Sequence, residues 1–595
     1  MEFAKIHRQT LMWFAACAAA VAALSASAVE FSMCAAECCG MVTLSLDGLW
    51  DFSFSEGGAL AEATAGFKAD GKMPVPGCFD MMPPWRMKRG VGSYRRTFSI
   101  GRDAPSAYLV IKGMGLRARF WLDGREIGTS SLAWSELEFP IGALAAGEHV
   151  LAAAIDNTPL SGDAELFRPN YDFLASGGFY HGVELSFDNR RLFVRTRDYK
   201  SGTVEIEAVN FAERDFDATL LFDGKNEVAA KFRNSRATVK VPDFRLWSTE
   251  SPNLHTVSLK LTTPRLTTND YELTTKFGIR SFQCADGKFV LNGRSVFLKG
   301  VCRHESDYAD GYATSRQSMW RDIMLIKGLG ANFVRTAHYT PCEEFLDLCD
   351  EAGLLVWEET LGWGNGARQL ANPRFGDLQL EQARLMARKS INHPSVVIDS
   401  FLNECDSASE KGRALVGRIA AALKAEETGH LVTFACNRVD KDIANDETDF
   451  VAVNLYPAWH QSIGTATTHE SLKAAITNRF ASVAEKFKAK YPGKPIVISE
   501  TGCYSLYGER DGAAPQWSED FQAEYLAASV GFALESGIYQ GVSVWQFADA
   551  RTYFRGGSDI RTKPMGLNMA GLFDIHRREK LSAGEIRKLF TNANK

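Results

Sequence analysis

The pattern of apolar and polar positions divides the chain into three regions. From about residue 40 to 188, short runs of alternating apolar and polar residues follow one another, punctuated by glycine and proline. A period of two is typical of half-buried strands, and Asp123-Gly124 between two such runs predicts a hairpin turn. This region is expected to form a β-sandwich. Residues 189–277 continue in strands, and their length suits one immunoglobulin-like β-sandwich.

From residue 278 to 595 the pattern changes, because unbroken apolar runs now alternate with amphipathic stretches. One such stretch has Met319, Ile323 and Ile326 at helical spacing. Runs without alternation are expected for strands that are buried on both faces. Eight runs separated by helices predict a (β/α)8 barrel. The runs are Val296–Val301, Ala331–Arg335, Leu354–Trp357, Val396–Phe401, Leu431–Phe434, Phe450–Val453, Pro495–Ile498 and Gly541–Trp545.

The bulk properties restrict the class of function. The chain has 595 residues and a net charge of -5, with no clustered Lys and Arg. Nucleic-acid binding needs such clusters, so it is not expected. The 12 cysteines are spread too thinly for a small disulfide scaffold, although Cys34, Cys38 and Cys39 lie together near the start of the chain. A homo-oligomer remains compatible with the sequence.

The first 28 residues have the pattern of a secretory signal peptide. Lys5 and Arg8 precede an apolar run from Leu11 to Leu24, and cleavage is expected near Ala28 after Ala26-Ser27-Ala28. The mature protein is therefore expected to be secreted or periplasmic. A retained anchor and lipid attachment at Cys17 are the alternatives. No later stretch is long and apolar enough to predict stable insertion into a membrane.

Barrel active sites lie at the carboxyl ends of the strands, so the residues that follow each run are the candidates for chemistry. Carboxylic acids, histidines, amides and aromatic residues converge there, as expected for a site that acts on sugars. Cleavage of a glycosidic bond needs two carboxyl groups, one to protonate the leaving oxygen and one to attack the anomeric carbon or activate water. Glu404 after the fourth run and Glu500 after the seventh are the natural pair.

The residues around this pair have supporting roles in the same prediction. Glu358 and Glu359 follow the third run, and we expect one of them, with Glu358 preferred, to pair with Arg335 rather than to act in catalysis. His304 and His338 can be zinc ligands in barrel hydrolases. They lack a paired histidine and a third ligand, so no metal and no cofactor are predicted.

Several motifs give the chain a specific resemblance. The motifs are Ser45-Leu46-Asp47-Gly48-Leu49-Trp50, Arg335-Thr336-Ala337-His338-Tyr339, Ser400-Phe401-Leu402-Asn403-Glu404, Ile498-Ser499-Glu500-Thr501-Gly502 and Trp545-Gln546-Phe547-Ala548-Asp549. Through these motifs the chain resembles family 2 of the glycoside hydrolases, and within it the β-glucuronidases. The resemblance implies a jelly-roll sugar-binding domain over residues 40–188, the immunoglobulin-like domain at 189–277 and the catalytic barrel at 278–595.

The resemblance also implies roles for single residues. Glu404 would be the acid/base and Glu500 the nucleophile of a retaining exo-β-glycosidase, and Asn403 would bind the 2-hydroxyl of the sugar. The remaining residues implied to contact the sugar or the nucleophile are Asp172 of the jelly roll, His338, Asn454 and Tyr456 (both orienting Glu500), Trp545 as the floor under the ring, and Asn568. The partner would be a β-linked sugar conjugate or oligosaccharide.

One departure from the glucuronidase pattern concerns the glycone. Glucuronidases carry an Asn-x-Lys motif whose lysine binds the sugar carboxylate, but the matching positions here are Asn568 and Ala570. A buried carboxylate needs a cation. Either Arg555, Arg561 or Lys563 replaces the lysine, or the glycone is galactose, or it is galacturonate bound in another way. A β-glucuronidase-like hydrolase is the leading hypothesis, and a sugar-binding protein without activity is the alternative from another class.

Overall fold

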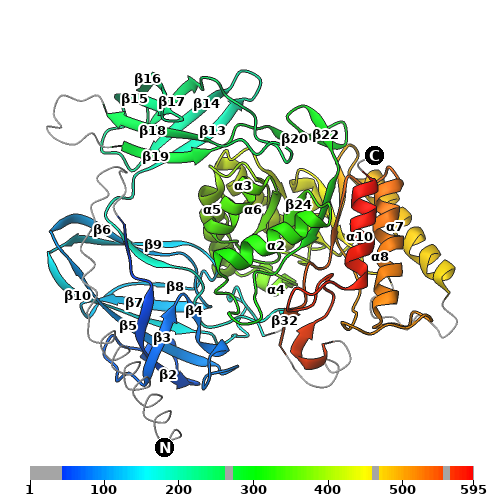
Figure 1. Ribbon diagram of the computed structural model, residues 1–595, viewed down its shortest axis with the longest axis horizontal. Coiled ribbons are helices and arrows are strands. Elements are labelled where there is room, and N and C mark those ends of the chain that lie inside the picture. Colours follow the sequence, from blue (N-terminus) through cyan, green and yellow to red (C-terminus); the bar gives the residue numbers. More distant parts are fainter. Residues whose placement is uncertain (1–42, 170, 262–271, 458–467, 554–562, 594–595) are drawn as a thin grey trace, which may run out of the picture.

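The computed structural model describes residues 43–169, 171–261, 272–457, 468–553 and 563–593. The expected signal peptide, the cysteines between residues 34 and 39, Arg555 and Arg561 lie outside the described residues. The chain forms three domains, which follow one another along the colour gradient in Figure 1. No described helix is long and apolar enough to cross a membrane.

The first domain is a jelly-roll β-sandwich. A six-stranded sheet of order β3-β2-β5-β10-β7-β8 faces a four-stranded sheet of order β1-β12-β6-β9, and β11 pairs with β4. The predicted hairpin is present between β7 and β8, where Asp123 and Gly124 both have positive φ. The strands are β1 (Thr43–Ser45), β2 (Gly48–Glu56), β3 (Gly71–Val75), β4 (Gly77–Cys78), β5 (Gly90–Ile100), β6 (Ala104–Ile111), β7 (Arg117–Leu122), β8 (Arg125–Ser130), β9 (Leu137–Leu144), β10 (Gly147–Asp156), β11 (Gly178–Phe179) and β12 (Val183–Ser186).

The second domain is an immunoglobulin-like sandwich. Sheets of order β13-β14-β17 and β16-β15-β18-β19 enclose a core that includes the stacked rings of Phe216 and Phe232. Burial alternates along β14 and β15, as the period of two predicts. The strands are β13 (Arg191–Asp198), β14 (Thr203–Val209), β15 (Phe216–Phe222), β16 (Asn226–Phe232), β17 (Arg236–Lys240), β18 (His255–Leu261) and β19 (Glu272–Phe277).

The third domain is the predicted barrel. A small antiparallel sheet, β20 (Phe282–Ala285), β21 (Lys288–Leu291) and β22 (Arg294–Val296), precedes it. The barrel strands are β23 (Leu298–Cys302), β24 (Phe333–Arg335), β25 (Leu355–Glu359), β26 (Val396–Ser400), β27 (Leu431–Thr433), β28 (Ala435–Cys436), β29 (Val451–Asn454), β30 (Ile496–Thr501) and β31 (Gly541–Val544). Their order is β27-β26-β25-β24-β23-β31-β30-β29-β28, with parallel neighbours. The two ends of this order are β27, which lies in the predicted fifth run, and β28, which directly follows that run, so the sheet closes through this part of the chain.

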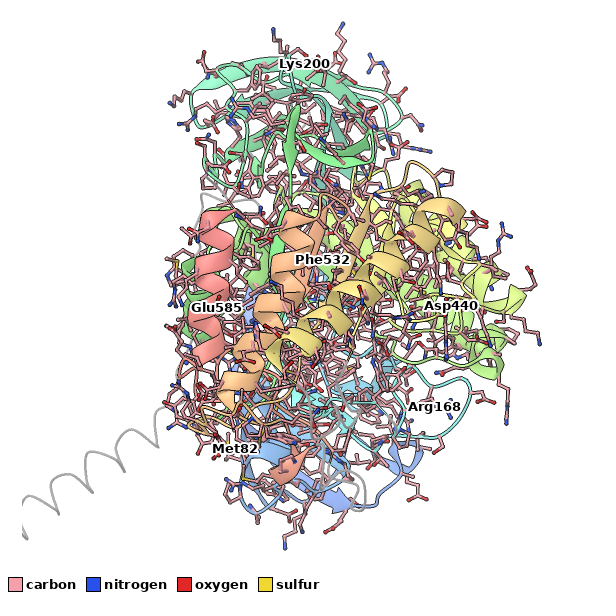
Figure 2. All side chains as sticks on the ribbon, turned by 90° about the vertical axis from the view of Figure 1, so that its right-hand side faces the viewer. Met82, Arg168, Lys200, Asp440, Phe532 and Glu585 are labelled. Atoms are coloured by element: carbon pink, nitrogen blue, oxygen red, sulfur yellow. The ribbon has the colours of Figure 1, made fainter. Side chains whose placement is uncertain are left out.

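Helices surround the barrel, and Figure 2 shows α7, α8 and α10 side by side on one face of it. The apolar spacing predicted within α2 is confirmed, because Met319, Ile323 and Ile326 are buried. The helices are α2 (Arg316–Gly328), α3 (Glu343–Ala352), α4 (Ala367–Leu370), α5 (Pro373–Ser390), α6 (Glu410–Ala425), α7 (His469–Lys490), α8 (Glu519–Glu535) and α10 (Leu581–Asn592). The short strands β32 (Ala550–Arg551) and β33 (Leu567–Asn568) pair after β31.

The jelly roll is fixed to the barrel through the segment between β10 and β11. The Tyr171 hydroxyl receives a hydrogen bond of 3.0 Å from Nδ2 of Asn365, in the loop after β25. The backbone N–H of Leu174 donates to the carbonyl of Arg551 at 3.3 Å. This segment therefore lies against the carboxyl ends of the barrel strands, where the predicted site is found.

Candidate active site

Glu404 and Asn403 lie in the loop directly after β26, and the backbone of this loop is unusual. Leu402 and Glu404 adopt φ values of 50° and 55°, a left-handed conformation that costs a non-glycine residue about 1–3 kcal/mol. Hydrogen bonds to β28 and to the loop after β25 hold it. The Glu404 N–H donates to Ala435 at 2.8 Å, and the Asn403 N–H donates to Gly362 at 3.1 Å. The loop is thus fixed at a conformational cost, which is characteristic of functional sites.

A single guanidinium organises the centre of the site. Arg335, at the end of β24, has no solvent exposure. It donates to Glu500 Oε1 at 2.5 Å, to Glu359 Oε1 at 2.7 Å and to Asn403 Oδ1 at 2.9 Å. Burial acts to raise the pKa of Glu359, but Arg335 and His338 outweigh it, so the pKa of this carboxyl group is lowered. Burial acts to lower the pKa of Arg335, but the two carboxylates outweigh it. The pKa of Arg335 is therefore raised well above its usual value.

Glu500, at the carboxyl end of β30, is held at both oxygens. Arg335 binds Oε1, and the Tyr456 hydroxyl donates to Oε2 at 2.6 Å. Tyr456 therefore has the predicted orienting contact with Glu500. A carboxylate that accepts hydrogen bonds at both oxygens keeps one position and one orientation, which is what an attacking group needs.

Glu404 has a different environment. Burial is the largest cause, and the nearby Glu500 carboxylate the second, of a rise in the pKa of Glu404 to about 7. Asn454, at the end of β29, donates to Glu404 Oε1 at 2.9 Å and to Asn403 Oδ1 at 3.1 Å. The expectation that Asn454 orients Glu500 is thus wrong, because its amide contacts the other carboxyl group. Two glutamates with contrasting environments suit one proton donor and one anion.

The expectation for Glu358 is also wrong. Residues alternate between the two faces of β25, and it is Glu359 that faces the site, where it pairs with Arg335 and contacts Nδ1 of His338 at 3.0 Å. Glu358 faces the helices, where Ser390 of α5 donates to it at 2.6 Å. Burial and the neighbouring Asp399 raise the pKa of Glu358 to about 8. The supporting role therefore belongs to Glu359.

Trp545, directly after β31, forms an aromatic surface with the two predicted histidines. Its ring stacks on His338 at a centroid distance of 5.2 Å and meets His304 edge-on at 5.3 Å. Burial, followed by the positive charges of His338 and Arg335, lowers the pKa of His304 well below its usual value. His304 is therefore a neutral ring at neutral pH. Neither histidine belongs to any metal-capable group of three among the described residues.

The jelly roll contributes Asp172 to the same rim. Its carboxylate contacts Asn568 Nδ2 and Thr552 Oγ1, both at 3.5 Å, and it forms an ion pair with Lys563. Desolvation lowers the pKa of Lys563 to about 8. The sequence offered three cations that could replace the lysine of the Asn-x-Lys motif, and Lys563 is one of them. Lys563 and Asn568 both contact Asp172, so the two residues lie close together.

A second lysine near Ala570 has a structural role. The Lys580 ammonium is completely buried and donates to the carbonyls of Ser505 and Met569 and to Asp549, at distances of 2.9 to 3.1 Å. An ammonium has three donors, and all three are used. Lys580 therefore fixes the backbone around Ala570 and has no donor left for a ligand. Sequence reasoning missed it because it follows the motif by ten positions.

Comparisons with known proteins agree with this site. Residues 282–594 match the model described as "Glycosyl hydrolases family 2, TIM barrel domain", and residues 188–280 match that of "Glycosyl hydrolases family 2". The matches define a barrel protein of the glycosyl hydrolase class. Because the barrel model alone covers more than half of the chain, the protein belongs to glycosyl hydrolases family 2.

Individual relatives extend the likeness. β-Glucuronidase of Rattus norvegicus is 29% identical over 383 residues, which are 62% of this chain but only 56% of the rat protein. β-Glucuronidase of Streptococcus agalactiae is 24% identical over 92% of this chain and 96% of its own length. The crystal structure of a β-galacturonidase from Eisenbergiella tayi bound to galacturonate has a TM-score of 0.80 and 28% identity, and covers 93% of this chain and 98% of that chain.

Proposed function

We propose that this protein hydrolyses terminal β-glycosides with net retention, and that a hexuronate, with glucuronate first, is the favoured sugar. The observation that carries the first part is the contrast between Glu404 and Glu500. Burial raises the pKa of Glu404 to about 7, so that about half of the molecules carry a proton there at neutral pH, whereas Glu500 is fixed by hydrogen bonds from Arg335 and Tyr456. A proton donor next to a fixed carboxylate is the requirement of the double-displacement reaction.

The reaction follows from these two states. Glu500 attacks the anomeric carbon while Glu404 gives its proton to the leaving oxygen, so the glycosidic bond breaks and a glycosyl ester of Glu500 forms. The ester carries no negative charge, which removes one of the causes of the raised pKa of Glu404. Glu404 then takes a proton from water as the water attacks the anomeric carbon. Glu500 leaves as a carboxylate, and both groups return to their starting states.

Asn403 offers the donor that the sugar 2-hydroxyl requires. Its Oδ1 accepts hydrogen bonds from Arg335 and Asn454, so the orientation of the amide is fixed. Its Nδ2 is buried and has no hydrogen-bond partner among the described residues. A buried amide donor without a partner is unusual in a folded protein, and a substrate hydroxyl would satisfy it.

The preference for a hexuronate rests on Lys563. It is the described cation that lies at the Asp172 and Asn568 end of the site, where the motif places the sugar carboxylate. The relatives that are named β-glucuronidase and β-galacturonidase support an acidic sugar. Ala570 at the lysine position favours the second candidate, a neutral galactoside.

Initial rates on nitrophenyl β-D-glucuronide, β-D-galacturonide and β-D-galactoside test this proposal. We expect a uronide to be hydrolysed fastest and Lys563→Met to remove most of that preference. Lys588→Met, on the exposed face of α10, is the matched control and should change nothing. If the galactoside is fastest and Lys563→Met has no effect, the acidic sugar is excluded. Sugar binding without hydrolysis of any β-glycoside would make the protein a binding module instead.

We also propose that the protein is exported and loses its first 28 residues. The proposal rests on the charged start, the apolar run and the Ala26-Ser27-Ala28 site. The amino-terminal sequence of the mature protein tests it. A start near residue 29 is expected, whereas an intact Met1 would contradict cleavage, and a lipid-modified Cys17 would show that the protein is anchored.

A further inference from the structure

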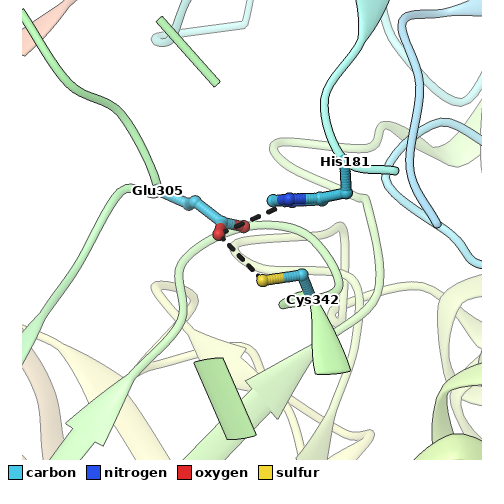
Figure 3. A group of neighbouring side chains, drawn as sticks. All are labelled: His181, Glu305 and Cys342. Atoms are coloured by element: carbon cyan, nitrogen blue, oxygen red, sulfur yellow. Dashed lines mark hydrogen bonds and ion pairs between the residues drawn. The ribbon is translucent and has the colours of Figure 1, made fainter. Parts of the chain in front are cut away.

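Three side chains from two domains meet away from the catalytic glutamates. His181 follows β11 in the jelly roll, Glu305 follows β23 in the barrel, and Cys342 is the N-cap residue of α3. Figure 3 shows the imidazole and the thiol pointing at the same carboxylate. All three are largely or completely buried, and one ligand atom of each lies within 4.8 Å of the others.

The separations are those between ligands of one metal ion. His181 Nε2 lies 3.6 Å from Glu305 Oε1, and Cys342 Sγ lies 3.3 Å from the same oxygen. With zinc–ligand bonds of about 2.0 Å to nitrogen and oxygen and about 2.3 Å to sulfur, tetrahedral angles give N–O and S–O separations of about 3.3 and 3.5 Å. The observed separations agree with these to within a few tenths of an ångström.

The other metal-capable groups among the described residues differ in this respect. In one, His393 Nδ1 and Asp350 Oδ2 are 2.6 Å apart. In the other, His430 Nδ1 and Asp399 Oδ1 are 2.8 Å apart. Those atoms share a proton in direct hydrogen bonds, and the distances are too short for two ligands of a tetrahedral ion.

The second carboxylate oxygen of Glu305 provides an independent observation. Glu305 Oε1 has several neighbours, among them Thr314 Oγ1 at 3.2 Å. Oε2 is buried and has no hydrogen-bond partner among the described residues. A thiol-to-carboxylate hydrogen bond at Oε1 accounts for the position of Cys342 but leaves this buried oxygen unsatisfied. A cation bound at the carboxylate would satisfy it.

The imidazole of His181 packs against the backbone of the jelly roll at Gly113. A Cβ atom on Gly113 would lie 2.9 Å from Cδ2 of His181, so the ring packs directly against that backbone. The backbone N–H of Tyr180 also donates to the Gly113 carbonyl at 2.9 Å. The His181 ring is thus packed against the backbone of its own domain.

We propose that His181, Glu305 and Cys342 bind one zinc ion that joins the jelly roll to the barrel. A thiolate and a carboxylate carry two negative charges, which neutralise a divalent cation in a buried place. The set of nitrogen, sulfur and oxygen donors selects zinc over magnesium and calcium, which prefer oxygen alone. The ion would fix the loop after β23, whose His304 contacts Trp545. Its role is therefore structural rather than catalytic.

Metal content of the purified full-length protein tests the proposal. After incubation with zinc and dialysis, the wild-type protein should hold one zinc per chain more than Cys342→Ala, and zinc should raise the Tm of the wild type but not that of Cys342→Ala. Cys349→Ala is the matched control, because this buried cysteine lies on the same helix outside the group. The three cysteines between residues 34 and 39 are present in every variant, so they cancel in the difference.

Cobalt provides the second measurement. Substituted cobalt should show thiolate charge-transfer absorption and the strong visible bands of a tetrahedral ion in the wild type and in Cys349→Ala, and neither in Cys342→Ala. His181→Asn, which keeps the cysteine, should lose affinity and provides a second variant if Cys342→Ala folds poorly. The proposal would be overturned if the wild type, Cys342→Ala and Cys349→Ala held equal amounts of zinc, or if the cobalt spectrum of the wild type lacked the thiolate band. Glycosidase activity should survive chelation at low temperature. A negative result for zinc binding would therefore leave the proposed glycosidase function untouched.

Discussion

Replacement of Glu404 by glutamine tests the assignment of the proton donor most directly. With its usual pKa of 4.5, a glutamate would be protonated in only about 0.3% of molecules at pH 7. With the pKa raised to about 7, roughly half of the molecules carry the proton. The environment of Glu404 therefore increases the fraction of active acid roughly 150-fold at pH 7. Glutamine keeps the shape but has no acidic proton to transfer to a leaving group.

The expected loss depends on the leaving group. General acid catalysis contributes about 10²- to 10⁴-fold, so kcat/KM for an alkyl β-glycoside should fall by that factor in Glu404→Gln. The nitrophenolate of a nitrophenyl glycoside leaves without protonation, so cleavage of this glycosidic bond should be much less affected by the substitution. The wild type should also lose activity as the pH rises through about 7, because Glu404 then loses its proton. This alkaline limb should be absent from Glu404→Gln.

Steady-state rates from pH 5 to 9 on one alkyl and one nitrophenyl substrate give both readouts. Glu358→Gln is the matched control, since it changes a second buried glutamate with a raised pKa on the opposite face of β25. It should leave the selectivity between the two substrates unchanged. Equal losses on both substrates, or an alkaline limb that persists in Glu404→Gln, would refute the assignment of Glu404 as the acid.

Three further predictions follow from the same contacts. Glu500→Gln should abolish turnover of every substrate, because an amide cannot form the glycosyl ester; measurable turnover by NMR, or an inverted product, would contradict the nucleophile. Arg335→Lys keeps the charge but cannot bind Glu500, Glu359 and Asn403 together, so kcat should fall by about 10²-fold or more with a smaller change in KM; a change in KM alone would argue against it. Glu358→Gln should raise the Tm more at pH 9 than at pH 5. Its folded-state pKa of about 8 lies above the unfolded value, so the stability contributed by the neutral glutamate is present at low pH and is lost as the pH rises through 8. A Tm difference that does not depend on pH would contradict the buried charge.

The fold was accessible from the sequence because burial leaves a simple signature. Parallel strands covered on both faces are unbroken apolar runs, and all eight predicted runs contain barrel strands. The barrel then places the residue after each run on one rim, so Glu404, Glu500 and Arg335 were found without any contact information. The short strand β28, which follows the predicted fifth run after Phe434, was not predicted, because two residues are too few to show a pattern.

The errors concern side-chain direction rather than position. Glu358 and Glu359 are adjacent and chemically identical, and only the phase of β25 in the barrel decides which of them faces Arg335. Asn454 is paired with Glu500 across β29 and β30, but the Ser499 hydroxyl donates to its Oδ1 at 2.7 Å. This contact turns the amide nitrogen toward Glu404. Motif spacing contains no information of this kind, because the contact depends on a residue of another strand.

The charges of the site give the proposed role of Lys563 its physical basis. Arg335 is opposed by Glu359 and Glu500, so when Glu404 carries its proton these four groups sum to one negative charge. A negative site stabilises the positive charge that develops at the anomeric carbon. The same charge opposes the entry of an anionic sugar. Lys563 and Asp172 cancel each other, but the ammonium has three donors and can bind a second carboxylate beside the first. A hexuronate would then lie with its carboxylate at Lys563 and its anomeric carbon at Glu500, each charge next to the group that compensates it.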